Sequence, residues 1–409
     1  MKRESLRFGA VAAVAMMALL MTPVSSSAGD ADAKWTFMVY LDADNNLETY
    51  GILNLDWLEE VGSSADVNFV VLMDTYGEDA DLLYVELGSS TQVGADYGYP
   101  KEVNMADPAI LEEFIEICCD DYPADKYALV LWDHGGGWRG LCWDDTTYEE
   151  TDVDDCITMV ELRDAMAGAY EDTVEVIDVV GFDLCLMAMP EVAYQVRDYA
   201  DYVVFSEETV PGQGYPYDAV AQALVDEPTM DGMGLSEVIV IEYAAFYEEL
   251  NIKDVTISAF DMAYMDELTA AVDYLGAELL DGLFTYMNNI QRDAILAQEY
   301  YYPYNIDLMG FADNLLGDAV IDDDGIKEAA ALVRDAVDDG IFACINGDHN
   351  YKSSGIAIYL PTTNEGMHHI KDDYIDVPFA TETSWYDFVE AFSHFYGRTW
   401  GLDSAVKSV

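Results

Sequence analysis

Basic residues are scarce in this sequence. Its 409 residues include 17 Lys and Arg against 80 Asp and Glu, for a formal net charge of −63, and lysine itself occurs nine times. Such a surface repels the phosphates of DNA and RNA and the headgroups of anionic lipids, which excludes nucleic acid as a partner and docking on such membranes. An acidic, lysine-poor exterior also favours a halophile or another salt-rich setting, because counterions screen the repulsion between carboxylates.

Long apolar runs are missing as well, apart from one near the N-terminus. Three basic residues in the first seven positions precede the apolar run 9–21, which is too short to span a bilayer comfortably, and small residues follow at Ser26-Ser27-Ala28. This order is typical of a cleaved signal peptide, which we place at residues 1–28. We therefore expect a secreted protein without a stable membrane anchor; an uncleaved N-terminal anchor is the alternative.

Cysteine is present but sparse, with six residues in the chain. An exported protein of this length does not need a disulfide framework, since its core is large enough to fold without one. Cys118 and Cys119 are adjacent within a helical pattern, where packing in the core is the expected role. Cys142 and Cys156 flank a loop and either pair or remain reduced.

Apolar residues make up 52% of the chain, and they are arranged in alternating strand and helix patterns from residue 35 onward. The helices are expected near 46–61, from Asp107-Pro108, near 158–170 and from Pro190. Buried, Val-rich strands that alternate with helices indicate an α/β fold with a mostly parallel central sheet and helices on both faces. The expected strands are Trp35–Leu41, Val67–Met73, Leu82–Leu87, Tyr127–Trp132, Val176–Phe182 and Tyr202–Ser206.

The pattern becomes more helical after Pro216, so we place a soft boundary near residue 230. Residues 29–230 would form the α/β core, and residues 231–409 a helical C-terminal extension. Two strand patterns in that extension, Val255–Phe260 and Gly355–Leu360, could extend the sheet. Aromatic residues at helical spacing from Trp385 onward predict a final helix that docks on the core.

Two of the expected strands end in reactive residues. Trp132 is followed by Asp133-His134-Gly135, and Phe182 is followed by Asp183-Leu184-Cys185. Because open α/β sheets bind ligands at the carboxyl ends of their strands, parallel neighbours would bring His134 and Cys185 together. An imidazole beside a thiol is the arrangement of a cysteine nucleophile with its base. Taken singly, each residue is more often a buried or merely hydrogen-bonded side chain.

Several segments resemble the clostripain family of cysteine peptidases, relatives of caspases and gingipains. The resemblance spans roughly residues 35–396 and implies a caspase-like α/β core. The segments that carry it are Tyr40-Leu41-Asp42-Ala43-Asp44-Asn45-Asn46-Leu47-Glu48, Trp132-Asp133-His134-Gly135-Gly136-Gly137-Trp138, Gly181-Phe182-Asp183-Leu184-Cys185-Leu186-Met187, Ser206-Glu207-Glu208 with Pro211-Gly212-Gln213-Gly214, Asp307-Leu308 with Phe311, and Gly355-Ile356-Ala357-Ile358-Tyr359-Leu360-Pro361.

The same resemblance implies roles for individual residues. Cys185 would be the nucleophile and His134 the general base, and the backbone N–H groups of Gly135 and Cys185 would form the oxyanion hole. Asp183 would line the pocket for a basic P1 side chain.

The chain departs from the family at a second acidic position of this pocket, where it has the neutral Gln213. Glu207 or Glu208 could compensate as further substrate-binding residues. A solvated or capping role for these two glutamates is the alternative.

The resemblance also raises Ca2+ as a requirement, although the chemistry itself needs no cofactor. The loop after the histidine strand holds many hard oxygen ligands, among them Asp144, Asp145 and Asp152, and a solvated acidic loop is the alternative. Asp42-x-Asp44-x-Asn46 begins like an EF-hand loop but lacks that loop's central Gly and closing Glu.

The sequence therefore predicts a secreted cysteine endopeptidase that acts on protein or peptide substrates, and the resemblance implies cleavage after Arg or Lys. A catalytically silent exported protein that binds cations or partners on the same fold is the alternative. The oligomeric state does not follow from the sequence.

Overall fold

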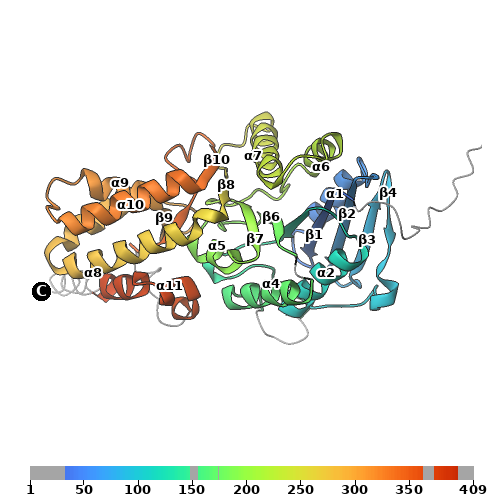
Figure 1. Ribbon diagram of the computed structural model, residues 1–409, viewed down its shortest axis with the longest axis horizontal. Coiled ribbons are helices and arrows are strands. Elements are labelled where there is room, and N and C mark those ends of the chain that lie inside the picture. Colours follow the sequence, from blue (N-terminus) through green and yellow to red (C-terminus); the bar gives the residue numbers. More distant parts are fainter. Residues whose placement is uncertain (1–32, 148–154, 174, 363–372, 395–409) are drawn as a thin grey trace, which may run out of the picture. The chain divides into compact units, whose positions relative to one another are not determined.

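One nine-stranded sheet organises the chain, in the order β10-β8-β7-β6-β5-β1-β2-β3-β4 (Figure 1). The computed structural model describes residues 33–147, 155–173, 175–362 and 373–394. The five central strands are parallel, and the antiparallel strands lie at the two sides. The strands are β1 Trp35–Ala43, β2 Val67–Thr75, β3 Asp81–Glu86, β4 Ser89–Gln92, β5 Tyr127–Trp132, β6 Ile177–Asp183, β7 Ala200–Phe205, β8 Thr256–Asp261 and β10 Ile341–Asn346.

Helices cover both faces of this sheet, as the alternating pattern predicted. One face is packed by α1 (Glu48–Glu59), α6 (Tyr217–Asp226) and α7 (Gly232–Glu249), and the other by α2 (Pro108–Asp121), α4 (Met159–Thr173) and α5 (Pro190–Val196) (Figure 1). Alternate residues of β1 enter opposite cores: Tyr40 packs with the α2 side and Leu41 with the α1 side. Because both faces are buried, the strands read as continuous apolar runs.

The region after residue 230 contributes to the sheet and also adds a helical layer. Its strands β8 and β10 extend the sheet on one side. The long helix α8 (Met265–Leu296) packs with α9 (Leu308–Gly317) and α10 (Asp324–Gly340). After α11 (Pro378–Glu382), residues 385–394 are helical, and Trp385, Phe388 and Phe392 are fully buried, as expected for a docking helix.

One predicted strand lies elsewhere. The pattern at Gly355–Leu360 forms β11 (Ala357–Tyr359), which pairs with β9 (Asn305–Asp307) in a separate two-stranded sheet. It does not extend the main sheet, whose side beyond β8 is taken by β10. An apolar strand pattern reports burial, and it does not specify the partner strand.

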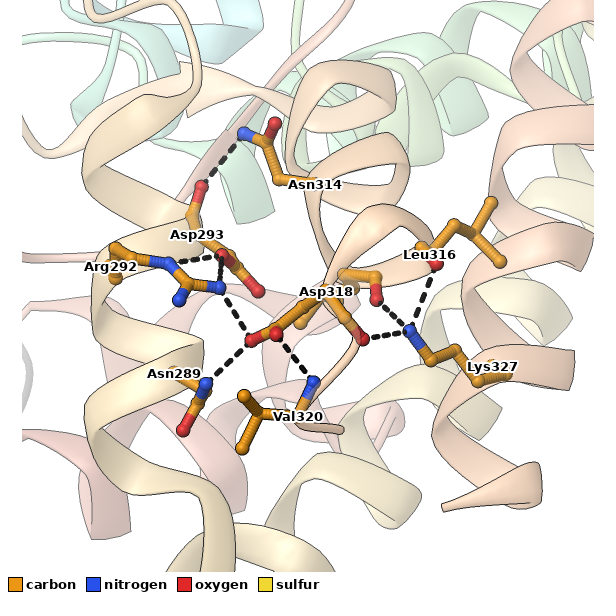
Figure 2. Close-up of polar contacts among 9 residues, drawn as sticks. Asn289, Arg292, Asp293, Asn314, Leu316, Asp318, Val320 and Lys327 are labelled. Carbon is orange, nitrogen blue, oxygen red and sulfur yellow. Dashed lines mark hydrogen bonds and ion pairs between the residues drawn. The ribbon is translucent and has the colours of Figure 1, made fainter. Parts of the chain in front are cut away.

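A polar cluster joins the three helices of the C-terminal region (Figure 2). Arg292 of α8 pairs with Asp293 at 2.7 Å and with Asp318, just after α9, at 2.5 Å. Lys327 of α10 donates to the carbonyl oxygens of Leu315, Leu316 and Asp318 at 2.6–2.9 Å. These bonds satisfy carbonyls at the C-terminus of α9 that lack a partner within the helix.

None of the six cysteines is in a disulfide, so Cys142 and Cys156 are not paired with each other. Cys118, Cys119 and Cys142 are buried. In the described part of the chain, none of the helices has the length and hydropathy needed to cross a membrane.

Candidate active site

Two neighbouring parallel strands deliver His134 and Cys185 to one edge of the sheet. Strands β5 and β6 pair with Trp132 opposite Asp183, so each reactive residue lies two positions beyond this matched pair. Both residues line one small cavity of about 110 Å³. The rest of its wall comes from Leu47, Trp132, Asp133, Asp183, Val210, Pro211, Gly212 and Gly214.

Asn46 orients the imidazole of His134. The Nε2 atom of His134 lies 2.9 Å from Oδ1 of Asn46. An amide oxygen only accepts hydrogen bonds, so Nε2 carries the proton in this arrangement and Nδ1 keeps its lone pair. Burial lowers the pKa of His134, opposed by the charge of Asp145. The resting imidazole is therefore neutral and able to accept a proton.

The thiol of Cys185 is held by the backbone of Val210. The Val210 N–H donates to Sγ at 3.3 Å, and Sγ donates to the Val210 carbonyl at 3.7 Å. Burial raises the pKa of Cys185 to about 11, and the charges of Asp183, Asp133 and Glu208 act in the same direction. The resting site therefore contains a thiol and a neutral imidazole, and ionisation has to accompany attack.

Gly135 lies against the backbone of Cys185. A Cβ atom at position 135 would lie 2.3 Å from the Cys185 carbonyl oxygen and 2.9 Å from its nitrogen, closer than such atoms approach. Only glycine allows these two strand ends to meet at this distance. The contact places the backbones of the two predicted oxyanion-hole residues side by side.

Asp183 lies at the base of the cavity and is almost completely buried. Its Oδ2 atom accepts hydrogen bonds from the Tyr215 N–H at 2.9 Å and the Tyr217 hydroxyl at 3.0 Å, while Oδ1 has no partner. Burial raises the pKa of Asp183 to about 7, although both hydrogen bonds favour the ionised form. A carboxylate oxygen without a partner in a buried cavity is suited to a cationic side chain of a ligand.

The other three pocket residues predicted from the sequence do not line this cavity. Glu207 is buried and accepts from the Tyr300 hydroxyl at 2.7 Å and the Gly355 N–H at 3.1 Å. Glu208 accepts from the Thr209 N–H at 2.8 Å, and the carbonyl of Gln213 accepts from Asn54 at 2.9 Å. Glu207 thus joins two segments of the fold, and Glu208 acts on Cys185 through its charge.

The predicted metal loop is only partly described. Asp144 is buried and accepts from the N–H groups of Met105 and Thr147, at 3.0 and 2.7 Å. Asp145 donates its N–H to the carbonyl of Asp44 at 2.8 Å. Asp152 lies outside the described residues. Two aspartates approach Asp144 from other segments, with one carboxylate oxygen from each of the three within 4.8 Å of the others. Asp44 was considered from the sequence only as part of an incomplete EF-hand loop, and Asp74 was missed.

Asn46 was also missed as a functional residue. It lies inside the segment from Tyr40 to Glu48 that carries the resemblance, but its contact with His134 bridges 88 positions in sequence. The register of β1 beside β5 was the signal that could have found it, because both strands end at the same edge.

A second cavity of about 700 Å³ adjoins the same histidine. His134 and Gly135 form part of its wall, together with Arg139, Trp143 and Asp373. His134 therefore lines two cavities: the small one that Asp183 also lines and the large one that Gly135 also lines.

A thiol and an imidazole on adjacent strand ends of an α/β sheet have the arrangement of a cysteine nucleophile with its base. Comparison with known families agrees, since residues 39–392 match the Clostripain family. The chain therefore belongs to the Clostripain family.

A curated relative, clostripain of Hathewaya histolytica, is 33% identical over 234 residues. The match covers 48% of this chain and 43% of the relative, so it spans less than half of that protein's length.

Solved structures support the fold. A secreted C11 cysteine protease of Bacteroides thetaiotaomicron, bound to an irreversible peptide inhibitor, has a TM-score of 0.63 at 20% identity, covering 88% of this chain and 99% of the other. An inactive zymogen C11 protease of Parabacteroides distasonis has a TM-score of 0.63 at 20% identity, covering 87% and 99%. The expected caspase-like architecture is thus confirmed at the level of the family fold.

Proposed function

We propose that this chain hydrolyses internal peptide bonds with Cys185 as nucleophile and His134 as base. The sulfur attacks the carbonyl carbon of the scissile bond while its proton moves to Nδ1 of His134. The N–H groups of Gly135 and Cys185 stabilise the oxyanion, and His134 then protonates the leaving amine as the C–N bond breaks. Water, deprotonated by the same imidazole, hydrolyses the thioester and frees the enzyme.

The observation that carries the proposal is the shared cavity of His134 and Cys185, with Asn46 fixing the tautomer that leaves Nδ1 as the base. The two cavities that share His134 support cleavage within a chain, because they offer room for substrate residues beyond the scissile bond.

Cleavage after Arg or Lys is the specificity that the small cavity favours. The unpartnered Oδ1 of the buried Asp183 would receive the cationic group of P1. Gln213 does not line this cavity. Of its two acidic lining residues, Asp133 has both carboxylate oxygens hydrogen-bonded, so Asp183 would supply the unpartnered oxygen of the pocket.

The setting that we propose is extracellular and rich in salt. The N-terminal residues 1–28 carry the features of a signal peptide, and the net charge of −63 favours a screened environment. We also propose Ca2+ as a stabilising ion, with Asp144 as a ligand and Asp145 and Asp152 as further candidates of the same loop.

Two variants test the chemistry. Cys185→Ala removes the nucleophile, and we expect turnover of Arg, Lys and uncharged P1 reporter peptides to vanish while the melting temperature stays near that of the wild type. His134→Ala should lower kcat by roughly 10²–10⁴-fold, because the thiol loses its base.

The rival hypothesis is a silent binding protein on the same fold. A thiol-directed peptide inhibitor should label Cys185 in the native wild-type protein, as read by peptide mass mapping, and should leave the other five cysteines unmodified. Unchanged peptide cleavage by the Cys185→Ala variant would reject the peptidase mechanism, and an unreactive Cys185 with no cleavage of any reporter would favour the silent protein.

A further inference from the structure

Arg139 differs from the other arginines of the described residues in having no carboxylate partner. Among the ion pairs of that part of the chain, none involves its guanidinium group. The chain has 80 acidic and 17 basic residues, so most cations have a carboxylate nearby. The arginines that do form ion pairs are Arg163, Arg197, Arg292 and Arg334. An unpaired guanidinium is available to an anionic ligand.

A closed turn holds Arg139 beside the catalytic backbone. Gly136 donates its N–H to the carbonyl of Gly140 at 3.0 Å and accepts the N–H of Arg139 at 3.4 Å. A Cβ atom at Gly136 would lie 3.4 Å from the Cβ of Arg139, so the arginine stem packs on the residue that follows Gly135. The guanidinium carbon lies 5.9 Å from the centre of the Tyr302 ring, within the range of a cation–π contact. The turn and the ring together fix the position of the charge.

The large cavity of about 700 Å³ relates this charge to the substrate. Its wall includes His134 and Arg139. Cys185 and Asp183 line the small cavity and not the large one. In the proposed reaction Cys185 keeps the acyl half of the substrate, and His134 protonates the amine of the departing half. A cavity that shares the imidazole but not the thiol is therefore suited to the residues after the scissile bond.

We propose that Arg139 binds a carboxylate of the substrate on the leaving-group side of the scissile bond. The inference rests on the proposed peptidase function and extends its specificity from P1 to the primed positions. The carboxylate belongs either to Asp or Glu at one primed position or to the C-terminus of a short leaving peptide. Both sources offer the pair of oxygens that a planar guanidinium binds through two N–H groups.

Two aspartates of the same cavity favour the opposite preference. Asp373 and Asp376 line it as well, and both are exposed to solvent. Within the described part of the chain, neither forms an ion pair with Arg139. Exposed carboxylates act weakly through water and are screened by salt, whereas a guanidinium fork adds directed hydrogen bonds. The rival outcome is a preference for Lys over Glu, so the substrates must include both.

Internally quenched peptides with Arg at P1 test the site. Each peptide has Glu, Gln or Lys at P1′, P2′ or P3′, Ala at the other primed positions and an amidated C-terminus. We expect the wild type to cleave the Glu peptide with a kcat/KM about 3–10-fold above that of the Gln peptide at one of these positions. The ratio should fall toward one in about 1 M NaCl, because salt screens an exposed pair.

The source of the carboxylate is distinguished by a second pair of peptides. These end at P2′ or P3′ with either a free carboxylate or an amide. A preference for the free acid, without any preference for Glu over Gln, identifies the C-terminal carboxylate as the group that Arg139 binds.

Substitutions of Arg139 test the assignment. Arg139→Gln should bring the Glu-to-Gln or acid-to-amide ratio close to one, and Arg139→Lys should retain part of it. Arg139→Glu should favour Lys over Gln at the same position. Each ratio compares two substrates of one preparation, so a loss of folded protein cancels. An equal ratio in the wild type and Arg139→Gln, or a wild-type preference for Lys over Glu at every primed position, would overturn the site.

Arg334→Gln is the matched control. Arg334 lies in α10, lines neither cavity and carries the same charge. This variant should keep the wild-type ratio. A ratio lowered as much as in Arg139→Gln would assign the preference to the overall charge of the chain and reject a site at Arg139.

Binding to the Cys185→Ala variant separates this inference from the proposed function. Calorimetry should show that the uncleaved carboxylate peptide binds more tightly than its neutral counterpart, and that adding Arg139→Gln removes the difference. Cleavage of a P1 reporter without carboxylate preference in either assay would keep the peptidase and reject the site. A preference in binding that depends on Arg139, with no cleavage of any reporter, would reject the peptidase and keep Arg139 as a carboxylate site.

Discussion

Position 135 has the tightest steric demand in the site, because the backbone of Cys185 occupies the space of a side chain. We expect Gly135→Ala to lower kcat by about 10²–10³-fold, since the added methyl group separates the two predicted oxyanion donors. Steady-state kinetics with a reporter peptide measure the effect.

Gly136→Ala is the matched control for that experiment. A Cβ atom there would come no closer than 3.3 Å to its neighbours, and φ at this residue is −114°. Its kcat should remain within a few fold of the wild type. Equal losses in the two variants would mean that the glycines act only through flexibility of the loop.

Asp183 gives the specificity a predictable dependence on pH. Its pKa is raised to about 7 by burial, so the carboxyl group is neutral below this pH and charged above it. The ratio of kcat/KM for an Arg substrate to kcat/KM for an uncharged P1 substrate should therefore rise as pH increases through 7. Titration of His134 and Cys185 affects both substrates and cancels in this ratio.

Asp183→Asn should remove the pH dependence of that ratio and should lower it above pH 7, because the charge-assisted contact with P1 is lost. Tyr217, whose hydroxyl donates to Asp183, stays neutral over this range because burial raises its pKa well above normal, and Tyr215 donates through its backbone N–H, which does not titrate. A ratio that stays flat with pH in the wild type would contradict a basic P1 pocket built on Asp183.

For individual residues, the sequence indicated the candidate site residues that directly follow a strand. It missed the residues from other segments of the chain that contact the site. His134 and Cys185 were found because each follows an apolar strand, and parallel strands end at one edge. Asn46 and Asp74 were missed because their contacts depend on the order β2-β1-β5 in the sheet. That order follows from crossover connections and not from any local pattern.

At the scale of helices and strands, Lys327 tests how much the contact between α9 and α10 contributes to stability. Its ammonium group binds three carbonyl oxygens at the end of α9 and thereby ties α10 to the α8–α9 pair (Figure 2). We expect Lys327→Met to lower the free energy of unfolding by about 1.5–3 kcal/mol, the range for hydrogen bonds to charged groups. Chemical denaturation followed by tryptophan fluorescence measures it.

Arg334→Met is the control within the same helix. The side chain of Arg334 is 43% exposed and pairs with the adjacent Asp335, an arrangement that contributes little to stability. Its loss should change the free energy of unfolding by less than about 0.5 kcal/mol. If both variants lowered the free energy of unfolding by the same amount, the loss of a positive charge would explain the effect, and the hydrogen bonds of Lys327 to the end of α9 would not.

The long, buried strands were predictable from the sequence, whereas the short edge strands were not. The five parallel strands are long, buried on both faces and flanked by helices, so their composition alone indicates them. β4, β9 and β10 escaped prediction: β9 has three residues, β4 is largely polar, and β10 begins directly where α10 ends. An edge strand needs only one hydrogen-bonding neighbour, and its sequence is correspondingly less constrained.

At the scale of the whole molecule, the central sheet contains strands from both sides of the boundary that we placed near residue 230. Strands β8 and β10 come from the C-terminal region, yet they continue the sheet beyond β7. Helix α7, which begins at Gly232, packs against β7, β8 and β10. A variant that ends near residue 230 would expose β7 along one side, so the full chain is the unit for experiments.

The charge distribution of the chain determines whether the enzyme can process itself. An enzyme with a basic P1 pocket needs Lys or Arg at the cut, and residues 140–162, between the histidine and cysteine strands, contain neither. Arg139 follows His134 closely within the short helix Gly137–Arg139, and Arg163 lies in α4, where it pairs with Glu382 at 3.9 Å. The peptide bond after Arg139 or after Arg163 could reach Cys185 of the same molecule only if the helix that contains the arginine unfolded.

We therefore expect the active protein to remain one chain across residues 140–162. Intact mass spectrometry after purification, followed by prolonged incubation at high protein concentration, measures this directly. The Cys185→Ala variant is the control, since any cut that it also shows comes from another protease. Two fragments with a new terminus inside 140–162, formed by the wild type alone, would contradict the prediction and would show that the cavity above Asp183 accepts a P1 residue without positive charge.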